Sequence, residues 1–473
     1  MSGSTFRRNA MRMAGALALA GAAAGLPAAG LPEAAAVAPP AIDMGALGPA
    51  LDLSHRPAPL EPTEQKSVCA EPTLVGGPPT EPPVAQQVLD LPAAWQFSRG
   101  AGQKVAVIDT GVNRHPRLPA LQPGGDFVSD SDGTADCDGH GTLVAGIIAG
   151  QPNPSDGFAG VAPDAELLTI RQLSLAYEGK DSRGGDRPDK IASSGYGSVL
   201  TLAAAVVRAV DLGATVINIS EVACTPAGSQ GADAPLGAAV KYAYDRNVVV
   251  VAAAGNVQQG GPCENQNEGS GWNAVTTVAT PAWFSPYVLS VASVDPEGGP
   301  SQLSLHGPWM GVAAIGRQIV SLDSKPGGTG LVDGVQTAEG VRPVEGTSFA
   351  APYVSGLAAL VRAKYPNMSA AQVIERITRT AHAPGAGRDD RVGHGLIDPL
   401  AALTDPLPDQ PVSAGADVPR AIAPPVPPAV PDPRPRRIAI VGSLVCLGGL
   451  GIGLAAAIPF RRSRAELDPD LEP

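Results

Sequence analysis

Four side chains that could together cleave an acyl bond lie in four separate short segments. Asp109 ends "VAVID", His140 stands in "DGHGT", Asn256 follows "VVVVAAAG" and Ser348 lies in "GTSFAAPYVSG". A serine hydroxyl becomes a nucleophile when an imidazole removes its proton, and a carboxylate fixes the tautomer of that imidazole. A side-chain amide and a backbone N–H can stabilise the oxyanion that forms. Asn256 and the Ser348 N–H could stabilise that oxyanion, so the four residues together could catalyse acyl transfer.

Each of these residues also has a simpler structural interpretation. Asp109 and Asn256 could form turns, His140 could cap a helix, and Ser348 could be an N-cap, because a hydroxyl satisfies an orphan backbone N–H there. These interpretations do not explain why all four residues fall at one edge of the expected sheet. We predict that Ser348 opens a helix and that this position both exposes its hydroxyl and directs its N–H at the oxyanion.

Short apolar strands alternate with Ala-rich helical stretches along most of the chain. The expected strands are 104–109, 166–171, 215–220 and 247–255, and the expected helices are 142–150, 197–212, 235–245 and 349–364. Such alternation predicts an α/β fold of three layers, with a parallel sheet flanked by helices on both faces. Ligands of open parallel sheets bind outside the carboxyl ends of the strands, where the four residues above would gather.

Composition narrows the class of function. The chain has 473 residues, 44% of them hydrophobic and 16% charged, with a net charge of −12. This acidic balance argues against a nucleic-acid partner, which would need clustered Lys and Arg. We expect no cofactor and no metal, because the acidic segment 126–138 lacks compact ligand spacing and is better interpreted as a solvated loop near His140. A calcium ion there is the alternative.

Both ends of the chain carry membrane signals. Arg7, Arg8 and Arg12 precede an apolar run and small residues, which is typical of a secretory signal peptide over 1–38. Residues 438–458 form 21 residues without a charge, enough for a single transmembrane helix. The signal peptide then leaves the main domain outside the cytoplasm. The remaining segments would be a Pro-rich linker over 404–437 and a cytoplasmic tail over 459–473.

Four cysteines outside the predicted membrane span suggest disulfides in an exported region. They are Cys69, Cys137, Cys224 and Cys263. Three pairings are possible, and the sequential one is the simplest; free buried thiols are an alternative, and a zinc site is disfavoured because no pair has C-x-x-C spacing. Residues 39–87 are expected to form an N-terminal extension, an extended arm wrapped on the domain. The polar stretch 177–197 is expected to be a mobile surface loop.

In this order, "VAVIDTGV", "DGHGT", "VINIS", "AAAGN" and "GTSFAAPYVSG" resemble the subtilisin-like serine peptidases over residues 88–403. The resemblance implies that Asp109 orients the imidazole, that His140 is general base and then acid, and that Ser348 is the nucleophile. It also implies that Asn256 and the Ser348 N–H form the oxyanion hole. An edge strand that pairs with the substrate backbone would consist of Asn218, Ile219, Ser220 and Glu221. The acidic Glu221 departs from the apolar residue usual there.

Further segments resemble the mycosins, the membrane-anchored subtilases of type VII secretion systems. They are "PTEQ" (62–65), "GGDF" (124–127), "RQLS" (171–174), "TPAWFSPYVLSVASV" (280–294) and "SLHGPWMGVAA" (304–314). This resemblance implies an endopeptidase that cleaves a narrow set of exported proteins and also stabilises the secretion membrane complex. Its partners would be those substrates, the complex components and the cell membrane. The alternative is a mainly structural component whose protease activity is dispensable.

Overall fold

The computed structural model describes residues 37–180, 195–229, 232–259, 261 and 263–407, together with short helical pieces at 442–443, 446–450 and 452–453. Contacts divide the chain into two units, Met1–Leu407 and Pro408–Pro473. Nearly all of the predicted signal peptide, the linker after residue 407 and most of the predicted membrane span lie outside the described residues. Among the helices that are described, none has both the length and the apolar character needed to cross a bilayer.

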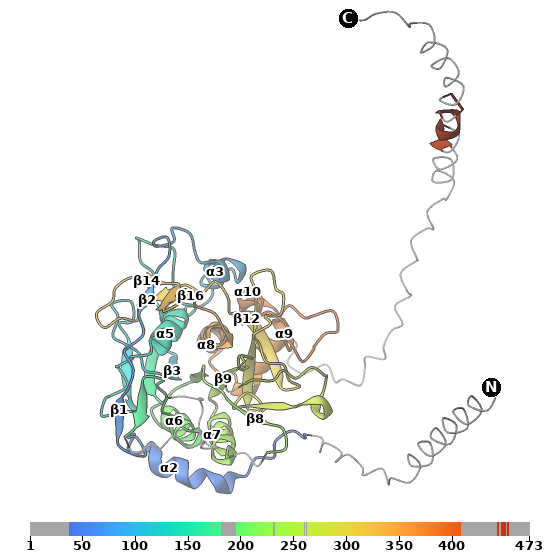
Figure 1. The fold of residues 1–473 in the computed structure, drawn as a ribbon. Coiled ribbons are helices and arrows are strands. Elements are labelled where there is room, and N and C mark those ends of the chain that lie inside the picture. Colours follow the sequence, from blue (N-terminus) through green and yellow to red (C-terminus); the bar gives the residue numbers. More distant parts are fainter. Residues whose placement is uncertain are drawn as a thin grey trace, which may run out of the picture. The chain divides into compact units, whose positions relative to one another are not determined.

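A seven-stranded sheet forms the centre of the first unit, and every neighbouring pair of its strands is parallel (Figure 1). Its strand order is β12-β11-β9-β7-β3-β5-β4. The strands are β3 (Lys104–Asp109), β4 (Leu121–Asp126), β5 (Glu166–Arg171), β7 (Val216–Ile219), β9 (Val249–Ala253), β11 (Val288–Val294) and β12 (Met310–Ile315). The central strands are buried on both faces, which explains their near-continuous Val, Ile and Ala.

Helices cover both faces of this sheet, as expected for an α/β fold (Figure 1). On one face, α6 (Val199–Asp211) and α7 (Ala234–Asp245) pack in one apolar cluster. On the other, α5 (His140–Ala149), α8 (Thr347–Lys364), α9 (Ala370–Thr380) and α10 (Pro399–Thr404) contribute to a second cluster. The predicted parallel sheet between two helical layers is therefore confirmed.

The N-terminal extension is more structured than the extended arm predicted from its sequence. It contains η1 (Met44–Leu47), α2 (Gly48–Ser54) and α3 (Val84–Val88), and is followed by α4 (Leu91–Ala94). Pro49 near the start of α2 and the buried Ala50 allow this short helix to pack on α6, where Arg208 Nη1 donates to the Ser54 carbonyl at 2.9 Å. The prediction of an extended arm was therefore wrong for this part of the extension, because its few apolar side chains lie on a short helix that packs against α6.

Two short strands of the extension pair with the rest of the domain. β1 (Thr63–Gln65) is antiparallel to β6 (Tyr177–Gly179), and β2 (Pro72–Thr73) is antiparallel to β15 (Gly334–Thr337). The predicted surface loop 177–197 therefore begins as a strand, and its residues 181–194 lie outside the described residues. The remaining small elements are β8 (Ala223–Pro226), β10 (Thr277–Thr280), β13 (Ser321–Leu322), β14 (Leu331–Val332), β16 (Gly340–Pro343) and η2 (Trp272–Ala274).

Two disulfides join Cys69 to Cys137 and Cys224 to Cys263, which is the sequential pairing. The first ties the extension to the loop that precedes α5, where the Ala70 N–H also donates to the Cys137 carbonyl at 2.8 Å. The second closes the segment after β7 onto the segment after β9. Both bridges therefore fasten loops that lead directly to the carboxyl edge of the sheet.

Candidate active site

Asp109 and His140 meet at the carboxyl edge of the sheet. Asp109 is the last residue of β3 and is fully buried, and His140 is the first residue of α5. Gly139 precedes it with φ +79°, a left-handed conformation that lets the chain turn sharply into the helix. His140 Nδ1 lies 2.7 Å from Asp109 Oδ1, which also accepts the Thr110 N–H at 2.7 Å. The carboxylate thus fixes the tautomer that leaves Nε2 free to accept a proton.

Asp136 holds the loop that presents His140. Its buried carboxylate accepts hydrogen bonds from the Gly139 N–H (2.7 Å), the Thr142 N–H (2.9 Å) and the Thr142 hydroxyl (2.6 Å). The Thr110 hydroxyl donates to Asp136 Oδ1, the oxygen that also accepts the Gly139 N–H, at 2.9 Å, and it accepts from the Gly141 N–H, also at 2.9 Å. The start of α5 is therefore fixed relative to the end of β3. Burial outweighs these hydrogen bonds and raises the pKa of Asp136 to about 7.

Ser348 lies in the first turn of α8 and is 7% exposed. The N-cap of α8 is Gly346, and no side chain caps the helix, so Ser348 opens the helix without being its cap. The adjacent Phe349 packs its ring on the His140 imidazole, with centroids 4.8 Å apart. This contact brings the first turn of α8 against the start of α5.

Asn256 borders the same small space as the serine hydroxyl. A Cβ atom built on Gly346 would lie 3.0 Å from Asn256 Nδ2 and 3.4 Å from Ser348 Oγ, so both groups face the bare Cα of this glycine. The side-chain oxygen of Asn256 accepts the Thr347 N–H at 2.9 Å and the Thr347 hydroxyl at 3.0 Å. Since the oxygen is occupied by donors, the amide nitrogen faces away from Thr347 and is available to an oxyanion.

Asn218 and Ile219 do not form an edge strand. They lie in β7, between β3 and β9, and both are fully buried. Asn218 Nδ2 donates to Ser220 Oγ at 2.9 Å, and its oxygen accepts the Ser355 hydroxyl at 2.8 Å. The prediction that these two residues lie in an edge strand was wrong, because sheet order is not visible in a local pattern. The Asn218 side chain instead joins β7 to α8, and Ile219 packs in the apolar cluster of α6 and α7.

Ser220 and Glu221 lie just beyond the end of β7. The Ser220 hydroxyl donates to the Ser348 carbonyl at 2.7 Å, so it fixes the backbone of the serine. Glu221 Oε1 lies 3.7 Å from His140 Nδ1, with 17% of its side chain exposed. Beside this segment, the Cys224–Cys263 disulfide packs over Gly255, whose Cβ would lie 3.2 Å from Cys263 Sγ.

The carboxylates around His140 shift its titration. Burial lowers the pKa of His140, but the charge and hydrogen bond of Asp109, followed by the charge of Glu221, outweigh that effect and raise it to about 10. Burial, then the Asp109 charge, raises the pKa of Glu221 to about 8. The site therefore retains protons to higher pH than isolated side chains would.

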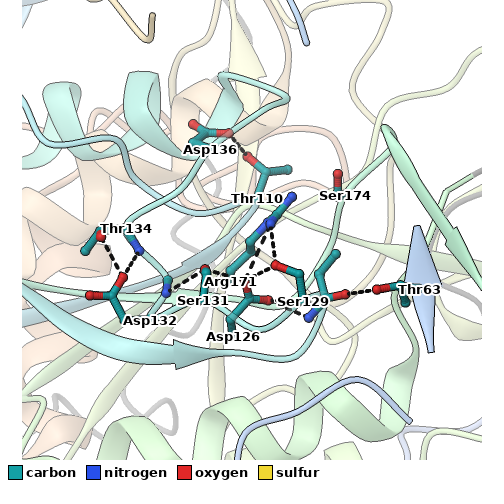
Figure 2. A network of polar contacts seen from close by, with 12 residues as sticks. Thr63, Thr110, Asp126, Ser129, Ser131, Asp132, Thr134, Asp136, Arg171 and Ser174 are labelled. Atoms are coloured by element: carbon teal, nitrogen blue, oxygen red, sulfur yellow. Dashed lines mark hydrogen bonds and ion pairs between the residues drawn. The ribbon is translucent and has the colours of Figure 1, made fainter. Parts of the chain in front are cut away.

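The acidic segment 126–138 is only partly the solvated loop that we expected. Asp130 and Asp132 are exposed, but Asp126 and Asp136 are buried. As Figure 2 shows, the Asp126 carboxylate accepts hydrogen bonds from the hydroxyls of Ser129 (2.9 Å) and Ser131 (2.6 Å). Arg171 at the end of β5 also lies 3.4 Å from it. Ser129 and Ser131 belong to the segment itself, but Arg171 comes from another strand, and composition alone could not reveal that these partners hold a buried carboxylate.

Among the described residues, Asp109, His140 and Glu221 form a cluster that could hold a metal ion. One ligand atom from each lies within 4.8 Å of the others. Sequence reasoning missed Thr110, Asp136 and Thr347, which position the central residues. The available signal for Thr110 and Thr347 was their place inside the motifs, next to Asp109 and Ser348, whereas Asp136 lies outside "DGHGT", four residues before His140.

Comparisons with known proteins show the family of the chain. Residues 100–395 match the model of the subtilase family. Mycosin-1 of Mycobacterium tuberculosis is 48% identical over 442 residues, which cover 91% of this chain and 95% of the relative. The crystal structure of MycP1 from Mycobacterium smegmatis matches with a TM-score of 0.73 and 44% identity, over 79% of this chain and 97% of that chain.

A third match comes from a larger assembly. A chain in the structure of an intact ESX-5 inner membrane complex matches with a TM-score of 0.73 and 41% identity, over 89% of this chain and 100% of that chain. The family model covers more than half of the sequence, and the mycosin similarity extends over nearly its whole length. The chain therefore belongs to the subtilase family of serine proteases and, within it, to the mycosins.

Proposed function

We propose that Ser348, His140 and Asp109 form the catalytic triad of a serine endopeptidase. The observation that supports this most is the 2.7 Å contact between the Asp109 carboxylate and His140 Nδ1, with the first turn of α8 packed against the imidazole. This arrangement leaves Nε2 to remove the Ser348 proton as the hydroxyl attacks a peptide carbonyl. The imidazolium then protonates the leaving amine, and water hydrolyses the acyl-enzyme by the reverse proton transfers.

The oxyanion hole would consist of Asn256 Nδ2 and the Ser348 N–H. Both groups are held before substrate arrives, the first by Thr347 and the second by its place at the start of α8. Preorganised donors stabilise the developing negative charge without having to reorient. Ser220 and Glu221, the two residues of the predicted substrate strand that lie beyond β7, would border the bound peptide.

We further propose that the enzyme is a single-pass protein of the cell membrane in a type VII secretion system. The uncharged segment 438–458 would be the anchor and 404–437 the linker, so that the catalytic domain lies outside the cytoplasm. Its substrates would be a few exported proteins. The names of solved relatives support the assignment to a type VII secretion system. The MycP1 structure is described as coming from the ESX-1 system and the MycP3 structure as coming from the ESX-3 system.

A second role has its own support. The matched chain in the ESX-5 inner membrane complex, and another in the periplasmic assembly of that complex, suggest that a mycosin also serves as a component of a membrane assembly. We propose that this chain stabilises its secretion complex independently of proteolysis. In the mainly structural alternative, the chain stabilises the complex in the same way, but its protease activity is dispensable.

Replacement of Ser348 by Ala separates the two roles. We expect Ser348→Ala to stop processing of exported proteins while the membrane complex still assembles, as measured by cell-envelope and secreted proteomes and by native gels of solubilised membranes. Ser229→Ala, at an exposed position, is the matched control. Unchanged processing in Ser348→Ala would contradict the protease role, and loss of the complex would contradict a separable structural role.

A further inference from the structure

The disulfide between Cys224 and Cys263, called the second disulfide below, lies against the residue that precedes Asn256. A Cβ atom built on Gly255 would lie 3.2 Å from Cys263 Sγ and 3.7 Å from Cys224 Sγ, so both sulfurs cover the bare Cα of this glycine. Gly255 has φ +101°, in the left-handed region where a side chain would be strained. The chain therefore turns from the end of β9 into Asn256 directly against the disulfide.

Hydrogen bonds hold the same glycine by its backbone groups. The Gly255 N–H donates to the Thr347 hydroxyl at 3.1 Å, and the Gly255 carbonyl accepts the Leu305 N–H at 3.0 Å. A hydrogen bond tolerates a change of several tenths of an ångström in its length, whereas close-packed atoms resist such a shift. The second disulfide therefore adds a constraint on Gly255 that the hydrogen bonds alone do not provide.

Cys263 also holds the chain beyond Asn256. Val257 forms a parallel β-bridge with Cys263, and the Gln258 N–H donates to the Cys263 carbonyl at 3.1 Å. Cys263 is itself buried, with 2% of its surface exposed. Asn256 therefore stands between two residues, Gly255 and Val257, that both contact Cys263.

Cys224 anchors the other half of the disulfide on the segment after β7. It lies in β8, where it pairs with Ala279 of the antiparallel strand β10. Four residues before Cys224, the Ser220 hydroxyl donates to the Ser348 carbonyl at 2.7 Å. The second disulfide therefore joins the segment that holds the Ser348 backbone to the segment that carries Asn256.

We propose that Cys224 and Cys263 are positioning residues of the oxyanion hole: their disulfide holds the Gly255–Asn256 turn so that Asn256 Nδ2 and the Ser348 N–H converge on one oxygen. The inference rests on the proposed triad and oxyanion hole. Donors stabilise an oxyanion only when they are already in place, and a displacement of about 1 Å can cost about a hundredfold in rate. Opening the disulfide should therefore slow the chemical step and leave binding nearly unchanged.

A double-mutant cycle tests whether the second disulfide acts through Asn256. The probe is a fluorophosphonate, whose phosphoryl oxygen needs the same donors when the Ser348 hydroxyl displaces fluoride from phosphorus. The maximal labelling rate and the apparent affinity of the probe are measured on the full-length protein. We expect the bridge-free variant, Cys224→Ser/Cys263→Ser, to be labelled about tenfold more slowly with little change in affinity. Asn256→Ala should be labelled about 100- to 1000-fold more slowly.

The variant that combines these changes gives the decisive result. If the second disulfide acts by positioning Asn256, its removal from Asn256→Ala should change the labelling rate by less than about twofold. A disulfide that merely stabilised the domain would change the rate by the same factor with or without the Asn256 amide. Equal factors in the two backgrounds, or an unchanged rate in the bridge-free variant, would overturn the inference.

The disulfide between Cys69 and Cys137 provides the matched control. It closes a longer sequence separation, 68 residues against 39, so Cys69→Ser/Cys137→Ser should lower the melting temperature at least as much as the bridge-free variant. Cys137 lies three residues before His140, so loss of this disulfide should slow labelling by the same factor with and without Asn256→Ala. Equal coupling of both disulfides to Asn256 would show a general loosening of the domain and would contradict a specific positioning role.

If the bridge-free variant does not fold, the second disulfide can be opened after folding. In Cys69→Ser/Cys137→Ser it is opened by dithiothreitol, which becomes a cyclic disulfide as both cysteines become thiols. Labelling should then slow about tenfold, and only while the Asn256 amide is present. Labelling that persists in Ser348→Ala would contradict the proposed triad, and Asn256→Ala labelled at the wild-type rate would contradict the proposed oxyanion hole and this inference with it. The other outcomes concern the disulfide alone, so the failures are distinguishable.

Discussion

The side-chain oxygen of Asn256 accepts two hydrogen bonds from a single residue, Thr347, through its backbone N–H at 2.9 Å and its hydroxyl at 3.0 Å. The Thr347 hydroxyl in turn accepts the Gly255 N–H at 3.1 Å. Thr347 therefore joins the segment after β9 to the start of α8 and fixes which end of the Asn256 amide faces Gly346, beside the Ser348 hydroxyl. Thr347, the residue next to the proposed nucleophile, therefore orients the proposed oxyanion donor.

Thr347→Val should lower kcat by roughly tenfold with little change in KM, because the amide of Asn256 loses its orientation while the substrate contacts remain. Asn256→Ala removes the donor itself and should cost about 100- to 1000-fold. Both values are measured with a fluorogenic peptide amide. Thr347→Ser keeps the hydroxyl and should retain most activity. An inactive Thr347→Ser enzyme, or a fully active Thr347→Val enzyme, would show that this hydroxyl does not orient the amide.

Asn218→Ala should destabilise the fold and leave substrate affinity nearly unchanged. The amide joins the hydroxyls of Ser220 and Ser355 in the interior, so its removal leaves buried polar groups unpaired and costs about 1–3 kcal/mol. Chemical denaturation measures the cost, and KM for the fluorogenic peptide should change by less than about twofold. A large rise in KM with unchanged stability would show instead that Asn218 binds substrate.

Replacing both Cys69 and Cys137 by Ser should lower the thermal stability of the domain. Their disulfide closes a sequence separation of 68 residues, for which loop entropy gives up to about 4 kcal/mol. Activity should also fall, since Cys137 lies three residues before His140. Reducing conditions also open the Cys224–Cys263 bridge, so the wild type under those conditions should melt at or below the temperature of the double variant, whereas Cys446→Ser should match the wild type. Equal melting temperatures for the double variant and the wild type would exclude a stabilising role.

The buried Asp136 predicts a specific pH dependence of stability. Its pKa in the folded protein is raised to about 7 from an ordinary value of 3.8, so the folded state binds the proton more tightly than the unfolded state. The Asp136 carboxyl therefore contributes least to the free energy of unfolding above pH 7, and this contribution grows as the pH falls from 7 towards 3.8.

Asp136→Asn lacks this titration, so the wild type should gain unfolding free energy relative to the variant over that range. The variant also turns an NH₂ group towards backbone N–H donors, which should cost about 1–3 kcal/mol. Urea unfolding at several pH values with the disulfides intact checks both statements. A constant difference in unfolding free energy across the range would contradict the raised pKa.

The parts of the fold that sequence could predict are those with a local signature. Apolar strands such as β3 and β5 are continuous because they are buried on both faces, and Asp109, His140 and Ser348 stand in short motifs where their residue types already indicate chemistry. The parallel sheet then requires the ends of its strands and the starts of its helices to gather at one edge.

Other features depend on contacts between distant segments. Asn218 looked like part of an edge strand because nothing in "VINIS" records that β3 and β9 lie on its two sides. Asp126 and Asp136 looked solvated although several of their donors are local, because each also meets a partner from a distant segment, Arg171 for Asp126 and Thr110 for Asp136. The helix α2 was missed because seven residues carry too little periodicity, and its stability comes from the α6 surface that it covers.

The most direct test of the account is to locate the residue that a fluorophosphonate probe modifies in the full-length protein, by mass spectrometry of proteolytic peptides. We predict one adduct, on Ser348, that disappears in Ser348→Ala and forms far more slowly in His140→Ala. No adduct on the wild-type protein, or equal labelling of Ser348→Ala, would contradict the assignment of this chain as a protease that acts through Ser348.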